Sequence, residues 1–152
     1  MQHVQAMMRL ALEEAVQDQN EVPVGAVIEK DGRVIARAHN EREKGSCFAH
    51  AEVLAMERAC AALGTRRLTG CTLYVTLEPC PMCAGAMVMA GLSKCVFGAF
   101  DEKQGCCGSV YLLTEDAAFY HRVETVGGVM EEECKKILQQ FFAEKRSGSS
   151  SL

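Results

Sequence analysis

Two short segments of the chain carry the residue types that metal-assisted chemistry needs. One is HAE at 50–52, and the other is PCPMC at 79–83. An imidazole and two thiolates form a ligand set that suits tetrahedral Zn²⁺. Because His50, Cys80 and Cys83 supply only three protein ligands, the fourth position is left for water, as in catalytic rather than structural zinc sites. The pattern therefore predicts a catalytic zinc site.

Glu52 gives this predicted site an acid–base group. Two thiolates roughly cancel the charge of the zinc ion, so the metal alone activates water less than a three-histidine site would. A carboxylate two residues from His50 can reach water on the metal, take its proton and deliver that proton to a leaving nitrogen. The chemistry predicted is the hydrolytic removal of an amine from an amidine-like carbon.

Two helix starts must bring these residues together. Helical spacing of apolar residues predicts a helix from 49 that stops at Gly64, and Pro81 suits the first turn of another helix, which runs to about Gly91. His50 then lies in the first turn of one helix, and the two cysteines flank the start of the next. Helix N-termini carry partial positive charge, which favours thiolates.

The rest of the pattern predicts a three-layer α/β/α domain with a mixed sheet of about five strands. The expected strands are 22–29, 33–38, 71–78, 94–100 and 122–126, and further helical segments are expected at 4–16, 117–120 and 130–146. Asp31-Gly32 predicts an antiparallel hairpin in front, and helical crossovers predict parallel pairing of the later strands. We expect one domain over 1–146 and a disordered Ser/Gly tail over 147–152.

Composition limits the class of protein. The 152 residues are 49% hydrophobic and 24% charged, which is typical of globular domains. Neither a membrane span nor a secretory signal is recognisable, so we expect a cytoplasmic protein with no membrane partner. In that compartment the nine cysteines are expected to be reduced core thiols or metal ligands. A net charge of −4 argues against a large nucleic-acid footprint but permits a local basic patch, for example at Lys145 and Arg146.

These motifs resemble the signature of the zinc nucleobase deaminases, in which HAE is followed by PCxxC, here at a distance of 30 residues. Longer segments resemble the bacterial tRNA-specific adenosine deaminases, within the zinc-dependent cytidine/deoxycytidylate deaminase superfamily. Those segments are EVPVGAV (21–27), CTLYVTLEPC (71–80), CAGAM (83–87), VFGA (96–99), DxKxG (101–105) and HRVE (121–124). The resemblance extends from about Gln2 to Phe142.

The resemblance implies roles for residues outside the motifs. Asn40 matches a loop asparagine that contacts the flipped adenosine, and Asp101 and Lys103 match the loop beside the substrate nucleotide. Phe141, with the basic end of the last helix, matches the part that touches flanking anticodon nucleotides. Cys47-Phe48 replace the usual Pro-Thr before the HAE segment, so we expect Ser46 rather than a threonine to cap the following helix.

The resemblance also implies an activity. It is the hydrolytic deamination of adenosine to inosine at the wobble position of a tRNA anticodon stem-loop. His50, Cys80 and Cys83 would hold one Zn²⁺ per subunit, and Glu52 would be the proton shuttle. Members of the family are homodimers with tRNA lying across both subunits.

Three alternatives stay open on the residues alone. A free nucleobase or nucleoside deaminase of the guanine or cytosine type could use the same site, and the acidic charge balance and the Cys47-Phe48 departure favour it. A structural zinc module that serves as an interaction platform would use the same ligands. A redox pair would need only Cys80 and Cys83, and would leave HAE without a role.

Overall fold

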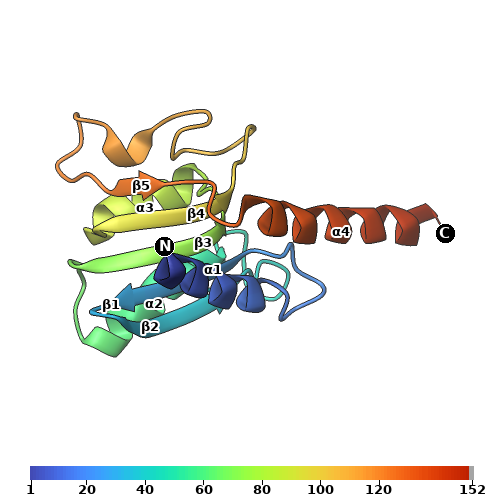
Figure 1. The fold of residues 1–152 in the computed structure, drawn as a ribbon, viewed down its shortest axis with the longest axis horizontal. Helices are drawn as coiled ribbons and strands as arrows, with labels where there is room; N and C mark the ends of the chain where they lie inside the picture. The colour runs from blue at the N-terminus through green and yellow to red at the C-terminus, as the bar shows by residue number, and fades with distance from the viewer. Residues whose placement is uncertain (151–152) are drawn as a thin grey trace.

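The computed structural model describes residues 1–150 and places a five-stranded mixed sheet between helices on both of its faces (Figure 1). The strand order is β2-β1-β3-β4-β5. The strands are β1 (Gly25–Lys30), β2 (Arg33–His39), β3 (Cys71–Leu77), β4 (Lys94–Ala99) and β5 (Glu124–Val126). The helices are α1 (Gln2–Ala15), α2 (Ala51–Leu63), α3 (Pro81–Ala90), the 3₁₀ turn η1 (Leu113–Glu115) and α4 (Glu131–Ser150). The predicted three-layer α/β/α class is confirmed.

The strand pairing is mixed in the way that the sequence predicts. β1 pairs antiparallel with both β2 and β3, and β3, β4 and β5 run parallel. Asp31 and Gly32, both with positive φ, form the hairpin turn between β1 and β2. Since β3 and β4 are parallel, their carboxyl ends meet at one edge of the sheet, where ligand sites of open α/β sheets usually lie.

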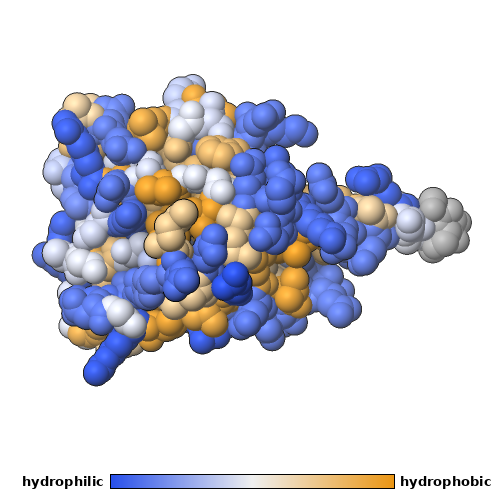
Figure 2. Space-filling view, viewed as in Figure 1, coloured by the Kyte–Doolittle hydropathy of each residue, from blue (hydrophilic) through white to orange (hydrophobic). Residues whose placement is uncertain are grey.

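Helices α1 and α4 belong to one outer layer, on the face turned to the reader in Figure 1. Val27, Tyr74 and Val96, from three neighbouring strands, pack toward this layer in one cluster with Met8 of α1 and Cys134 of α4. The rest of α4 projects beyond the sheet, and its surface is mostly hydrophilic in the view of Figure 2. Only the first turns of α4 are therefore held by the core.

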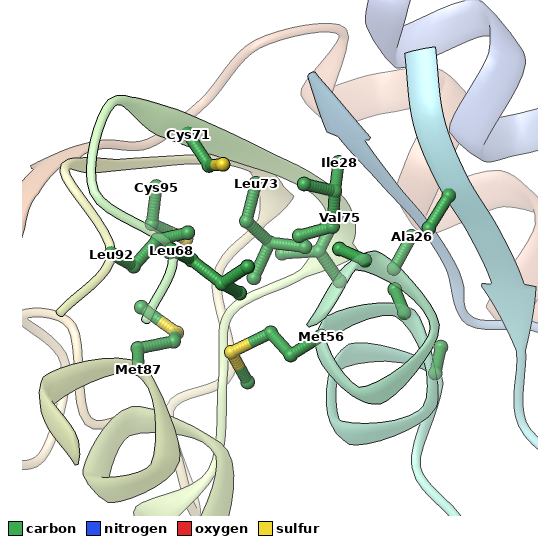
Figure 3. Packing of buried hydrophobic residues seen from close by; sticks show 14 of the residues in the cluster. Ala26, Ile28, Met56, Leu68, Cys71, Leu73, Val75, Met87, Leu92 and Cys95 are labelled. Atoms are coloured by element: carbon green, nitrogen blue, oxygen red, sulfur yellow. The ribbon is translucent and has the colours of Figure 1, made fainter. Parts of the chain in front are cut away.

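Helices α2 and α3 form the opposite layer. The alternate residues of the same strands, such as Ile28, Leu73 and Cys95, point to this side, as the two-residue period of a strand requires (Figure 3). There they meet Met56 of α2 and Met87 of α3. Both clusters share one sheet, which supports our proposal that residues 1–146 are a single domain.

Two local expectations differ from the structure. The helical turn expected at 117–120 lies at 113–115, because the Asp116 carboxylate accepts the N–H of Ala118 and holds the following residues in a separate turn. The chain continues as helix through 147–150, part of the expected disordered tail, since extending an existing helix costs far less than starting one. Residues 151 and 152 of that tail lie outside the described residues.

Within the described range 1–150, no helix has the length and the apolar character needed to cross a membrane.

The contact of α4 with β4 gives a stability test. A Cβ added at Gly98 of β4 would lie 2.3 Å from Cys134 Sγ and 2.9 Å from the carbonyl oxygen of Thr76. We expect Gly98→Ala to lower the free energy of unfolding by about 1–3 kcal/mol through overpacking, as measured by urea denaturation.

The matched control for this test is Gly85→Ala in α3, where an added Cβ meets nothing within 4 Å. Alanine in a helix interior should hold or raise stability by up to about 1 kcal/mol. Equal stability of the two variants would contradict the packing of α4 on β4.

Candidate active site

Three metal-ligating side chains converge where α2 and α3 begin. His50 is the N-cap residue of α2, Cys80 is the N-cap residue of α3, and Cys83 lies in the first turn of α3. Their ligand atoms all lie within 4.8 Å of one another. The distances from His50 Nδ1 are 3.6 Å to Cys80 Sγ and 3.5 Å to Cys83 Sγ.

These separations fit a zinc ion. Tetrahedral zinc with Zn–S of about 2.3 Å and Zn–N of about 2.1 Å would separate nitrogen from sulfur by about 3.6 Å. The donor set, one imidazole and two sulfur atoms from helix starts, is also one that zinc prefers. His50, Cys80 and Cys83 therefore have both the chemistry and the spacing to hold the metal.

The start of α2 is fixed by Asn40 rather than by the residue that we expected. Asn40 Oδ1 accepts the N–H of Ala51 at 2.9 Å, and Asn40 Nδ2 donates to the carbonyl oxygen of Val22 at 3.2 Å. Ser46 Oγ accepts the N–H of Phe48 instead, so the prediction that Ser46 caps α2 was wrong. The loop folds back at Ser46, whereas the end of β2 brings Asn40 directly beside the helix start.

The two cysteines and the histidine lie within hydrogen-bond distance of one another and shift one another's pKa. A hydrogen bond from the Cys83 thiol lowers the pKa of Cys80 to about 4, and His50 acts in the same direction. Because the Cys83 thiol donates this hydrogen bond to Cys80, the pKa of Cys83 is raised, and burial raises it further. The pKa of His50 is raised mainly by its hydrogen bond with Cys80. A divalent cation can replace the protons of such groups, because metal ligands bind in their deprotonated forms.

Glu52 lies beside these groups and is buried, with 4% of its surface exposed. Burial is the main reason that its pKa is raised to about 7, and its carboxyl also hydrogen-bonds to the Cys83 side chain. A carboxyl that gains and loses a proton near neutral pH is suited to general acid–base catalysis. The structure thus brings Glu52 and the predicted ligands to one place.

A pocket of about 980 Å³ opens over this group and is bounded by the 40–52 segment, the end of β3, the 100–109 segment and α4. Asn40, Asp101 and Lys103, which the resemblance placed at the substrate, all line it. Asp101 also orders its own loop, because its Oδ1 accepts the N–H groups of Lys103 and Gln104.

Phe141, which the resemblance placed at the substrate, does not line this pocket. It lies on the side of α4 that faces the end of α1, where it borders a separate cleft with Val16 and Pro23. Its neighbour Phe142 lines the pocket instead, 45% exposed, with the two rings packed edge to face 5.3 Å apart. Sequence spacing did not distinguish two adjacent phenylalanines, because their directions depend on how α4 docks.

Sequence reasoning missed several further polar residues of the pocket wall. Among them are Arg42, Glu78 and Ser109. Glu78 carried a recognisable signal, since it is a charged residue at the end of an apolar strand, directly before the PCPMC segment. Arg42 and Ser109 lie in polar loops, where nothing in the sequence sets them apart from their neighbours.

Comparisons with known proteins agree with this geometry. The sequence profile of the MafB19-like deaminases matches residues 1–146. The tRNA-specific adenosine deaminase of Bacillus subtilis (strain 168) is 54% identical over 142 residues, which cover 91% of this chain and 88% of that protein.

Solved structures give the same result. One from studies of A-to-I editing by tRNA:A34 deaminases at the wobble position of transfer RNA superposes with a TM-score of 0.83 and 43% identity, covering 88% of this chain and 99% of that chain. A guanine deaminase from Bacillus subtilis superposes less completely, with a TM-score of 0.60 and 38% identity over 62% of this chain and 63% of that chain.

The ligand cluster predicts a metal dependence. We expect purified protein to hold about one zinc ion per chain, and Cys80→Ser to lower zinc affinity by more than about 100-fold, since even changes behind the ligands cost 10–100-fold. Metal content after dialysis against a chelator measures this. Cys60→Ser, which changes a half-buried thiol of α2 outside the cluster, is the control and should retain the metal. Equal zinc in both variants would contradict the ligand assignment.

Proposed function

This chain belongs to the MafB19-like deaminases and to the tRNA-specific adenosine deaminases, and from that premise we propose that it converts the wobble adenosine of a tRNA anticodon to inosine. The observation that carries the proposal is the placement of buried Glu52 against the His50, Cys80 and Cys83 cluster at the base of one pocket. Hydrolytic deamination needs a metal site and a proton carrier in that relation.

The reaction replaces the amino group on C6 of adenine with oxygen from water and releases ammonia. Zinc held by His50, Cys80 and Cys83 would supply a Lewis acid that makes water nucleophilic at neutral pH. The carboxyl of Glu52 takes the proton from the attacking water and passes it to the departing amino nitrogen. Its burial, which brings its pKa to about 7, lets the same carboxyl group accept and return a proton.

We propose that the pocket wall holds the extruded base. Asn40 uses one amide hydrogen and one lone pair for Val22 and Ala51, which leaves one of each for the base. Asp101 and Lys103 stand at the rim beside the nucleotide. Phe141 faces away from the pocket, so we assign it and the Lys145 ammonium, 5.4 Å from its ring centroid, to flanking nucleotides of the anticodon loop.

Incubation with an anticodon stem-loop and, separately, with free purines and pyrimidines tests the function. We expect inosine at the wobble position of the RNA and no ammonia from the free compounds. Ammonia from guanine or cytosine without inosine in the RNA would favour the free-base alternative instead.

Glu52→Ala tests the mechanism. We expect zinc to be retained and kcat on the stem-loop to fall by at least about 10²-fold, the lower end of what general acid–base groups contribute. Glu13→Ala, at an exposed position of α1, is the control and should keep full turnover. Normal turnover by Glu52→Ala would remove this carboxyl from the mechanism.

The proposal includes a homodimer, as the family resemblance implies, and a cytoplasmic location, where tRNA is found. Met89 of α3 is 72% exposed and stands beside an apolar groove formed by α2 and α3. Val53, Met56 and Ala86 contribute to that groove. A protruding side chain next to a groove on the same surface lets two copies fit each other about a twofold axis.

Met89→Glu tests this surface. We expect light scattering to give a dimer mass for the wild-type protein and a monomer mass for the variant, because a buried, unpaired charge disfavours association. Val34→Glu places the same charge on β2, away from the groove, and should remain dimeric. A monomeric wild-type protein would contradict the dimer.

A further inference from the structure

We propose that Glu78 is a positioning residue for this reaction, which fixes the rim loop, residues 101–109, over the site. The inference rests on the proposed function, since it concerns how the same pocket holds its substrate. Glu78 follows β3 and precedes Cys80 by two residues, and only 2% of its surface is exposed.

The Glu78 carboxylate is bound entirely by the rim loop. Oε1 accepts the N–H of Asp101 at 3.0 Å and the hydroxyl of Ser109 at 2.5 Å. Oε2 accepts the N–H groups of Cys107 at 3.1 Å and Ser109 at 3.0 Å. A carboxylate has about four acceptor sites, so these donors occupy all of them. Although Glu78 borders the pocket, it has no acceptor left for a substrate, and its role is to hold the loop.

The rim loop is wrapped tightly around this carboxylate. A Cβ at Gly105 would lie 2.3 Å from the carboxyl carbon of Glu78, so only glycine lets the backbone pass there. The Gly105 N–H donates to the Asp101 carbonyl at 2.8 Å, which closes the loop on itself. Cys107 is buried against the main core beside the sheet. The loop therefore has one backbone path, defined from inside by Glu78.

Glu78 also ties this path to the metal-ligand segment. The Glu78 N–H donates to the carbonyl of Ala99 in β4, and the Cys106 N–H donates to the carbonyl of Pro79, both at 2.9 Å. One dipeptide, 78–79, thus connects the end of β3, the end of β4 and the rim loop immediately before Cys80. The outward face of the loop carries Asp101 and Lys103 into the pocket wall, at a position set by these bonds.

Glu78→Gln tests the role because it keeps the size of the side chain and replaces an acceptor with a donor facing backbone N–H groups. We expect KM for the stem-loop to rise about 10-fold and kcat to change less than about 2-fold, since the loop binds substrate and Glu52 is untouched. Zinc content should not change. In the protein without substrate, amide hydrogen exchange should quicken over 101–109 and not over α2.

The matched control is Glu29→Gln. Glu29 is also buried, 8% exposed, but its carboxylate binds Tyr74 and His3 on the α1 side and does not line the pocket. This variant should keep the wild-type KM. Ser109→Ala, which removes one of the four donors and leaves the carboxylate in place, should give a smaller rise in KM and serves if Glu78→Gln folds poorly.

The outcomes separate this inference from the function that it rests on. An unchanged KM and unchanged exchange over 101–109 in Glu78→Gln would overturn the inference, and so would loss of zinc, because Glu78 would then act through Cys80. Wild-type turnover of a free purine in place of the stem-loop would overturn the proposed function. The substrate-free exchange experiment would still decide whether Glu78 holds the rim loop.

Discussion

The site depends on the start of α2 lying against the start of α3, so that one imidazole nitrogen stands about equally far from two sulfur atoms. The parallel pairing of β3 with β4 and the antiparallel pairing of β1 with β3 set where these helices begin. Asn40 then bridges the end of β2, the Val22 segment and the first amide of α2. A shift of either helix by one residue would turn a ligand away, since successive helical residues point about 100° apart.

Buried carboxylates hold the loops around that junction. Glu21, 3% exposed, accepts the N–H groups of Arg42 and Glu43 on one rim of the pocket, as Glu78 does on the other. Hydrogen bonds from several backbone amides compensate the cost of burying a charge, and they fix a loop backbone without defining its outward side chains. This arrangement leaves residues such as Arg42 and Lys103 free to meet a substrate while the loop keeps its path.

The helices and strands, whose apolar residues recur at a regular spacing, were predictable from the sequence. The contacts made by irregular loops were not. The alternation of apolar residues in β1 and β3 and their helical spacing in α2 predicted the sheet and its layers. The HAE and PCPMC motifs predicted the ligand cluster. The cap of α2 by Asn40 and the four hydrogen bonds that Glu78 accepts join residues that lie 11 to 31 positions apart in irregular loops. The preference of a residue for helix, strand or turn does not encode such pairs. The choice between Phe141 and Phe142 likewise depended on the docking of α4 against β4.

The net negative charge of this chain is compatible with the proposed RNA substrate when the charges are considered by their place on the surface. The three glutamates at 131–133 lie in the first turn of α4, where they complement the helix dipole, and Lys135 is paired with Glu131. Lys145 follows those glutamates by at least 12 residues in the same helix, and its ammonium lies 5.4 Å from the centroid of the Phe141 ring. The cationic groups that can meet phosphate are therefore few, with Arg42 and Lys103 at the pocket and Lys145 on α4, which favours a loop that presents one base and a few flanking phosphates over a long duplex.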